Sequence, residues 1–124
     1  KDPVELFVVQ NVVLDGLMYP LVYDTIIDDV LSSQGGTQVA MLTQFMTDWF
    51  AETKKWSDAT VKIAAAESAE NKQILAQWLT EWRDRAASAL LPVARIALGD
   101  RTDAVMADVV QQFNARMAKA GVAI

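Results

Sequence analysis

The chain has 124 residues, of which 52% are hydrophobic, and it carries a formal net charge of −5. It contains no cysteine, which excludes a disulfide framework and thiolate metal sites. The acidic balance and the scattered basic residues argue against a nucleic-acid-binding surface, because such a surface needs clustered Lys and Arg.

The apolar content is high for a domain of this length. Four Trp, four Phe and five Met must be accommodated in 124 residues, and a small domain has little interior in which to bury them. We therefore expect part of this surface to be buried against partner chains. The chain also starts at Lys1-Asp2-Pro3 without an initiating Met, and we interpret it as a segment of a longer polypeptide.

The first predicted helix spans residues 3–32. Its apolar residues occupy most faces, which is typical of a helix buried on most sides. A continuous helix of this length would extend about 45 Å, which suits a larger bundle better than a compact small domain. Pro20 predicts a kink or break within it. The longest uncharged run, residues 30–47, is interrupted by Gly35-Gly36, so we expect no membrane-spanning helix there and no membrane partner.

Gly35-Gly36 predicts a turn, and a second helix follows over residues 37–68. A near-heptad apolar seam runs along it and predicts packing against other helices at shallow angles, as in helical bundles. The seam comprises Leu42, Phe45, Trp49, Glu52, Trp56, Ala59, Ile63 and Ala66.

Two further helices are predicted over residues 71–98 and 102–119, on either side of the breaker Gly99. Trp78 and Trp82 share one face of the third helix by their spacing. The fourth helix is the most simply amphipathic. No strand pattern, linker or repeat is evident, so the sequence predicts an all-α array of about four long helices.

Three stretches of the sequence resemble the β subunits of phenol hydroxylases, in the family of bacterial multicomponent monooxygenases. They read FVVQNVVLDGLMYPLVY from Phe7 to Tyr23, MLTQFMTDWFAET from Met41 to Thr53, and AAAESAEN from Ala64 to Asn71. Trp78 and the string Trp82-Arg-Asp-Arg85 add to the similarity. The resemblance covers most of residues 7–99 and is weaker in the last helix.

This resemblance implies a ferritin-like fold, of the kind found in ribonucleotide reductase small subunits, and a place in the C-terminal part of a longer β subunit. It also implies a cytoplasmic hydroxylase built from α, β and γ subunits, with a di-iron centre in α that hydroxylates phenol and related aromatics. Electrons from NADH would arrive through a separate reductase, and a regulatory protein would act on the complex. The β subunit would lack iron.

A di-iron centre of the kind found in this family requires particular ligands. Such a centre needs Glu residues and two Glu-x-x-His pairs, whereas the sequence has no His. The nearest pattern is Glu52-Thr-Lys-Lys55, in which Glu52 lies within the apolar seam. One interpretation of Glu52 is a metal ligand or a proton-handling carboxylate. We favour a second interpretation, in which Glu52 is a buried carboxylate paired with a base such as Arg83 or Arg85, because a lone buried charge is costly.

We therefore predict no catalytic, cofactor-binding or metal-binding residue in this chain, and a structural role beside the di-iron α subunit and the γ subunit. The predicted subunit-contact residues are Phe7, Tyr23, Trp49, Trp56, Trp78 and Trp82. The alternative is an autonomous helical module that recognises a partner helix, which predicts a stable monomer. A third hypothesis, an independent metalloenzyme with carboxylate-only ligands, is disfavoured by the absence of His.

Overall fold

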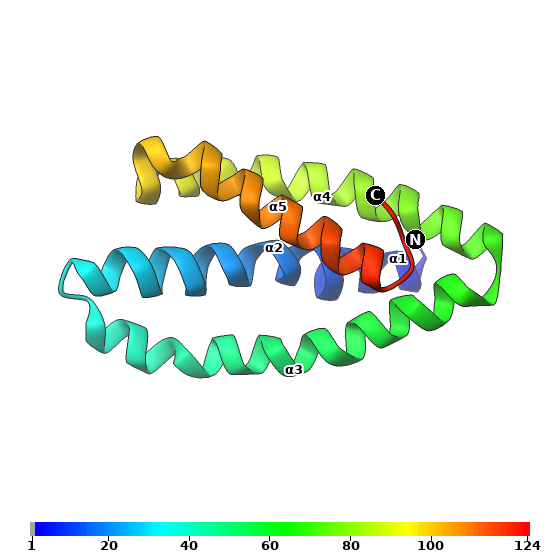
Figure 1. The fold of residues 1–124 in the computed structure, drawn as a ribbon, viewed down its shortest axis with the longest axis horizontal. Helices are drawn as coiled ribbons and strands as arrows, with labels where there is room; N and C mark the ends of the chain where they lie inside the picture. Colours follow the sequence, from blue (N-terminus) through cyan, green and yellow to red (C-terminus); the bar gives the residue numbers. More distant parts are fainter. Residues whose placement is uncertain (1) are drawn as a thin grey trace.

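The computed structural model describes residues 2–124, and all regular secondary structure in this range is helical, which confirms the all-α prediction. Each long helix is antiparallel to the next, and α5 crosses over the first helix and α4 (Figure 1). The first helix, Pro3–Leu31, is made of α1 (Pro3–Phe7), η1 (Val8–Leu14), α2 (Asp15–Tyr19) and η2 (Pro20–Leu31). It is followed by α3 (Thr37–Glu67), α4 (Ala69–Leu98), η3 (Gly99–Arg101) and α5 (Thr102–Lys119).

The helices begin and end within about two residues of the predicted bounds, because the breakers act locally. Gly35 and Gly99 adopt φ angles of 88° and 55°, which a residue with a Cβ rarely adopts. Between α3 and α4 only Ser68 leaves the helical conformation, with φ −157° and ψ 158°. Its Oγ accepts a hydrogen bond of 3.0 Å from the Asn71 backbone N–H, which caps the start of α4.

The first helix is the central element and continues through Pro20, so the predicted break does not occur. It widens instead into two π-helical stretches, in which the Asp15 N–H bonds to the Gln10 carbonyl and the Ser32 N–H to the Ile27 carbonyl. Pro20 has no N–H to donate, and the second stretch begins there.

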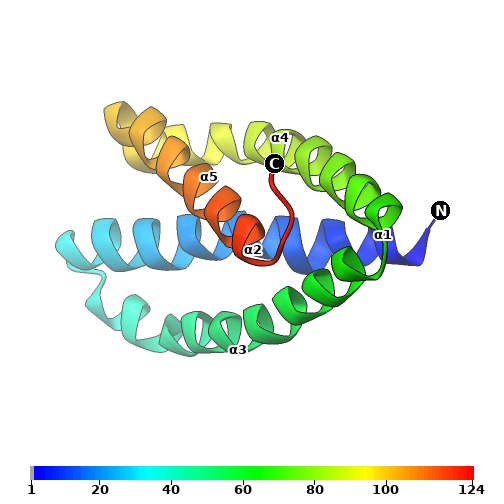
Figure 2. The ribbon, with the colours of Figure 1, turned by 45° about the vertical axis from the view of Figure 1, so that its right-hand side comes forward.

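By length and composition the helix Pro3–Leu31 could also cross a membrane. A core helix has the same composition, and this one packs against α3, α4 and α5 (Figure 2).

The core is formed where the first helix meets α4 and α5. Several apolar side chains of the first helix are fully buried, and they pack with Leu79 of α4 and with Phe113 and Met117 of α5. These first-helix residues are Val8, Val12, Val13, Leu17 and Leu21. Burying a side chain of this size stabilises the fold by about 1.5–3 kcal/mol, so this cluster accounts for the central position of the first helix.

Gly16 allows α5 to approach the first helix closely. A Cβ at this position would lie 2.9 Å from Arg116 Nη1 and 3.0 Å from the Phe113 ring. Neither group can easily move away, since Phe113 is buried and the Arg116 guanidinium is held by hydrogen bonds to α3. The absence of a side chain at Gly16 is therefore a packing requirement.

Substituting Gly16 by Val is expected to loosen α5. Overpacking of this kind costs about 1–3 kcal/mol, more than a Gly-to-Ala change would return in helix propensity, about 1 kcal/mol. Gly16→Ala, which adds the crowded Cβ itself, should therefore be mildly destabilising, by up to about 2 kcal/mol, and Gly16→Val more strongly so. Hydrogen exchange of the α5 amides in the assembled protein measures this. Gln10→Val, which places the same side chain on the exposed surface of the same helix, should leave α5 protected, and equal protection in Gly16→Val would refute the packing argument.

Arg116 anchors α5 to α3. Its Nε donates to Asp58 Oδ1 at 2.6 Å and its Nη2 donates to Ser57 Oγ at 3.0 Å. The Arg116 side chain is only 12% exposed, and burial lowers its pKa while Asp58 opposes that shift. On the other side of α5, Arg83 Nη1 donates to Asn114 Oδ1 at 3.0 Å, which links α5 to α4.

Candidate functional site

The aromatic seam of α3 lies on the outside of the described chain. The residues of α3 that pack inward are Ala40, Phe50, Ser57, Val61 and Ala65. On the opposite face a run of large apolar side chains is exposed, with Leu42 at 74% and Trp49 at 66%. We call this run the α3 stripe, and it consists of Met41, Leu42, Phe45, Trp49, Trp56 and Ile63. The expectation that the seam packs against neighbouring helices is therefore wrong within residues 2–124.

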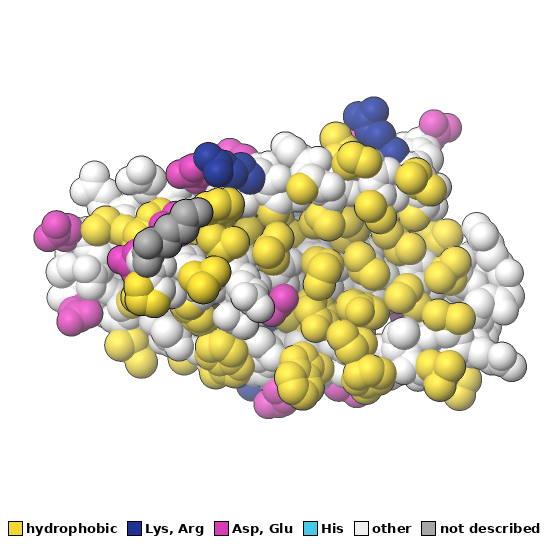
Figure 3. All heavy atoms as spheres, turned by 180° about the vertical axis from the view of Figure 1, so that it is seen from behind, with side chains coloured by type: hydrophobic (Ala, Val, Ile, Leu, Met, Phe, Trp, Pro, Cys, Tyr) yellow, Lys and Arg dark blue, Asp and Glu magenta, His cyan; other side chains and the backbone are white. Residues whose placement is uncertain are grey.

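The α3 stripe borders a broad apolar face. Seen from the side opposite α5, hydrophobic side chains cover the middle of the molecule from α4 across the first helix to α3, and charged groups lie mainly at the edges (Figure 3). The first helix adds further exposed apolar residues, among them Leu6 and Leu14. Monomeric proteins rarely expose apolar surface of this extent, and such a face is typical of an interaction surface.

Trp49 and Trp56, two of the six predicted contact residues, are exposed and belong to the α3 stripe. Phe7 lies at the edge of the stripe, half-buried, with its ring 5.7 Å from that of Trp56. A partner chain could reach all three without rearrangement of the helices. Their contact with another subunit stays a prediction.

The other three predicted contact residues are half-buried in the packing of the chain itself. Trp78 and Trp82 pack against the core, and Trp82 Nε1 donates to Glu5 Oε1 at 3.0 Å. Tyr23 lies beside Tyr19, with ring centroids 5.1 Å apart. The predicted contact set omits other exposed residues of the α3 stripe, above all Phe45. Phe45 belongs to the near-heptad seam, but the seam predicts packing between helices and not contact with another subunit.

Glu52 is not a buried carboxylate in this structure, which corrects the prediction. Its side chain is 73% exposed and pairs with Lys55 of the same helix at 2.6 Å. The proposed partners are engaged elsewhere, Arg83 with Asp84 and Arg85 with Glu81. The prediction failed because the seam that contains Glu52 faces outward. An exposed pair of this kind contributes about 0–1 kcal/mol.

Two carboxylates of the first helix, Asp15 and Asp24, have shifted pKa values. Burial raises the pKa of Asp15, and Arg116 opposes the shift. Burial also raises the pKa of Asp24, against the hydrogen bond that Asp24 accepts from Thr47 Oγ1 at 3.2 Å. Within residues 2–124 no three carboxylates come close enough together to hold a metal ion.

Comparison with known proteins connects this arrangement to one family. The family described as Methane/Phenol/Alkene Hydroxylase matches residues 1–68, more than half of the chain. The oxygenase component DmpL of phenol 2-monooxygenase from Pseudomonas sp. (strain CF600) is 43% identical over 121 residues, which is 98% of this chain and 35% of that protein. The component MhpL from Acinetobacter pittii (strain PHEA-2) is 45% identical over 98 residues, 79% of this chain and 29% of that protein.

A solved structure shares the fold. The crystal structure of xenon-pressurized phenol hydroxylase from Pseudomonas sp. OX1 contains a chain that is 37% identical and superposes with a TM-score of 0.88, over 98% of this chain and 36% of that one. The expected helical hydroxylase fold is thereby confirmed. The chain spans about a third of the length of the relatives that it matches.

Proposed function

Since the chain belongs to the methane/phenol/alkene hydroxylase family, we propose that it is a structural, non-catalytic segment of the oxygenase component of a phenol-type monooxygenase. In this proposal its helices form part of the scaffold against which a di-iron catalytic subunit is held. The substrate would be phenol or a related aromatic, and NADH would supply the electrons through a separate reductase.

The α3 stripe is the observation that carries the proposal. The inward face of α3 carries Phe50 and Val61 among smaller residues. The large side chains Phe45, Trp49 and Trp56 stay exposed within residues 2–124. Aromatic residues are enriched in the buried centres of protein interfaces. The hydrophobic contribution of the stripe is therefore gained only when another polypeptide covers it.

The donor chemistry of the chain supports a di-iron centre elsewhere. A carboxylate-bridged centre in a helical bundle uses Glu side chains and two Glu-x-x-His pairs. The 124 residues contain no His, and Lys55 stands at the histidine spacing after Glu52, where its ammonium group is bonded to the carboxylate. These residues do not fit such a centre, and we assign the oxidation step to the partner α subunit.

Native mass spectrometry and metal analysis of the assembly test the proposal. The chain should be recovered together with other oxygenase subunits, and after the subunits are separated the iron should be found with a different chain. Isolated chain should aggregate or fold poorly. Stoichiometric iron on this chain would instead support the independent metalloenzyme. Recovery of the chain as a stable monomer with a cooperative thermal transition would support the autonomous interaction module.

A further inference from the structure

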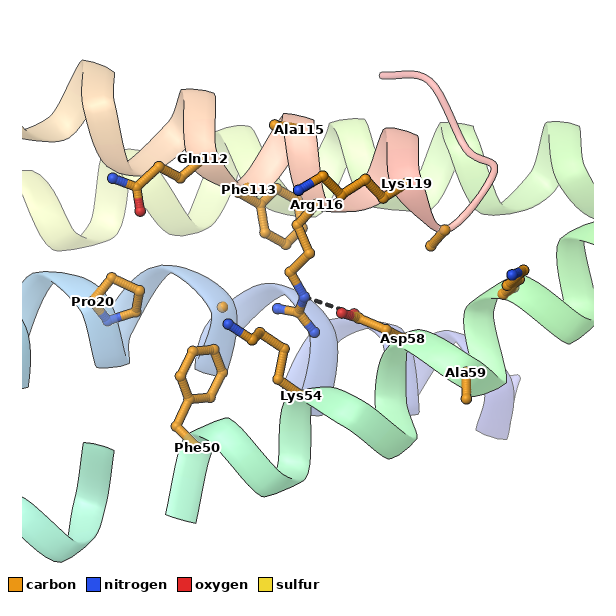
Figure 4. A pocket seen from close by; sticks show the side chains of 13 residues that line it. Pro20, Phe50, Lys54, Asp58, Ala59, Gln112, Phe113, Ala115, Arg116 and Lys119 are labelled. Atoms are coloured by element: carbon orange, nitrogen blue, oxygen red, sulfur yellow. Dashed lines mark hydrogen bonds and ion pairs between the residues drawn. The ribbon is translucent and has the colours of Figure 1, made fainter. Parts of the chain in front are cut away.

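A pocket of about 510 Å³ lies between α3, α5 and the middle of the first helix. Its apolar wall includes Phe50, Phe113, Ala59 and Pro20, and the Arg116–Asp58 pair lies within it (Figure 4). The pocket is on the opposite side of the molecule from the face shown in Figure 3, because α5 forms one of its walls.

The charge of this pocket is opposite to that of the chain. Lys54, Lys62, Arg116 and Lys119 are four of the eleven basic residues, and they line it together with a single one of the sixteen acidic residues, Asp58. Because Asp58 already pairs with Arg116, the three lysines leave a formal excess of positive charge among the lining residues. Two carboxylates outside the lining reduce this excess, because Asp15 attracts Arg116 and Asp24 attracts Lys54. Such a concentration of one sign attracts an oppositely charged ligand.

The three lysines make no strong contact within residues 2–124, although Lys54 is attracted by Asp24 and lies over the Phe50 ring. Within residues 2–124 none of them forms an ion pair, and all three are exposed. Lys54 Nζ lies 5.6 Å from the centroid of the Phe50 ring, and Lys54 and Lys119 approach the pocket from α3 and α5, on opposite walls (Figure 4). Their ammonium groups are therefore available to a ligand that enters between the two helices.

From this arrangement we propose that the α3–α5 pocket receives an acidic polypeptide segment from outside these 124 residues, whose carboxylates pair with Lys54, Lys62 and Lys119. The inference rests on the proposed function, because it requires the chain to be assembled. The relatives are components of an oxygenase, and we take the segment to belong to another component of that assembly.

A polypeptide suits the pocket better than a small inorganic anion does. The pocket is far larger than one carboxylate or phosphate, and its aromatic and aliphatic walls call for an apolar group beside the charges. Lys54 and Lys62 are two helical turns apart, about 12 Å along α3. Carboxylates about four residues apart in an extended segment, at ~3.3 Å per residue, would match this spacing.

Zero-length carbodiimide cross-linking of the native assembly tests the proposal, because it joins a lysine amine to a carboxylate that it already contacts. Mass spectrometry should identify links from Lys54, Lys62 or Lys119 to Asp or Glu outside residues 1–124. Acetylation of the same lysines should be about tenfold slower than that of Lys72, an exposed lysine at the start of α4. If the three lysines react as fast as Lys72 and form no cross-links while the assembly is intact, the pocket proposal is wrong. The proposed function would be unaffected by that result.

Substitutions separate charge from shape in the same assembly. The triple variant Lys54→Gln, Lys62→Gln, Lys119→Gln should lower the salt concentration at which the segment is released, while the matched Lys→Arg triple variant should retain it, because it keeps the charges. Equal behaviour of the two variants would contradict the proposal. If no assembly containing the chain can be isolated, the proposed function and the pocket proposal both fail. If added phosphate alone protects the three lysines from acetylation, the ligand is an inorganic anion and the polypeptide proposal is wrong.

Discussion

Replacing Phe45 and Trp49 by glutamate is expected to detach the chain from its oxygenase assembly while the chain keeps its helices. Both side chains are more than half exposed, so the change removes little packing within the chain, and glutamate is a good helix former. In an interface, loss of a central aromatic residue costs about 2 kcal/mol or more, roughly a 30-fold loss of affinity for each position. The two buried charges would weaken the complex further.

Co-purification with the other subunits and circular dichroism of the released chain measure this result. The matched control is Ala107→Glu with Gln111→Glu, which adds the same two side chains at the same four-residue spacing on an exposed part of α5. The control variant should remain in the assembly. If the Phe45/Trp49 variant also remained there, the α3 stripe would not be the contact surface and the proposed scaffold role would lose its main support.

Replacing Arg116 by methionine should release α5 from α3. The substitution leaves Asp58 and Ser57 without their partner on α5. Removal of one member of a fully buried ion pair costs about 3–5 kcal/mol. The Asp58 side chain is 31% exposed, so water recovers part of that loss and we expect a cost of about 2 kcal/mol.

Hydrogen exchange along α5 measures the effect, because an opening of α5 raises exchange there first. The double variant Arg116→Met, Asp58→Leu should recover part of the protection, since no unpaired charge remains. Lys55→Met breaks the exposed pair with Glu52 and should change nothing measurable. An Arg116→Met chain with wild-type exchange in α5 would show that apolar packing around Phe113 and Met117 is sufficient to hold this helix.

The sequence predicted the helices well because their signals are local. Gly35, Ser68 and Gly99 interrupt the backbone at the places where the structure turns. The family was identified from long strings of residues rather than from any short motif, and the comparisons support the same assignment.

The orientation of α3 could not be predicted in the same way. Periodicity shows that a helix has an apolar face, but not which polypeptide covers it. The large side chains of the seam suggested an inward face, whereas the inward residues are mostly small, such as Ala40, Ser57 and Ala65. The error at Glu52 followed from this assignment.

The link between Arg116 and Asp58 was missed for a different reason. The two residues are 58 positions apart in sequence, and a single charged residue on an amphipathic helix carries no signal of a distant partner. The grouping of the three lysines in the α3–α5 pocket could not be predicted either, because they come from two helices that only the folded chain brings together.

The single-residue joint at Ser68 has a mechanical consequence. Two backbone dihedral angles set the angle between α3 and α4, and α3 is a lever about 46 Å long. A rotation of ~10° at Ser68 would displace the far end of α3 by about 8 Å. That end is tied to the first helix through the tight turn at Gly35 and Gly36, so α3 is supported at both ends like a beam. A force on the middle of α3, such as contact with a partner chain, would therefore bend the helix rather than rotate it as a whole about Ser68.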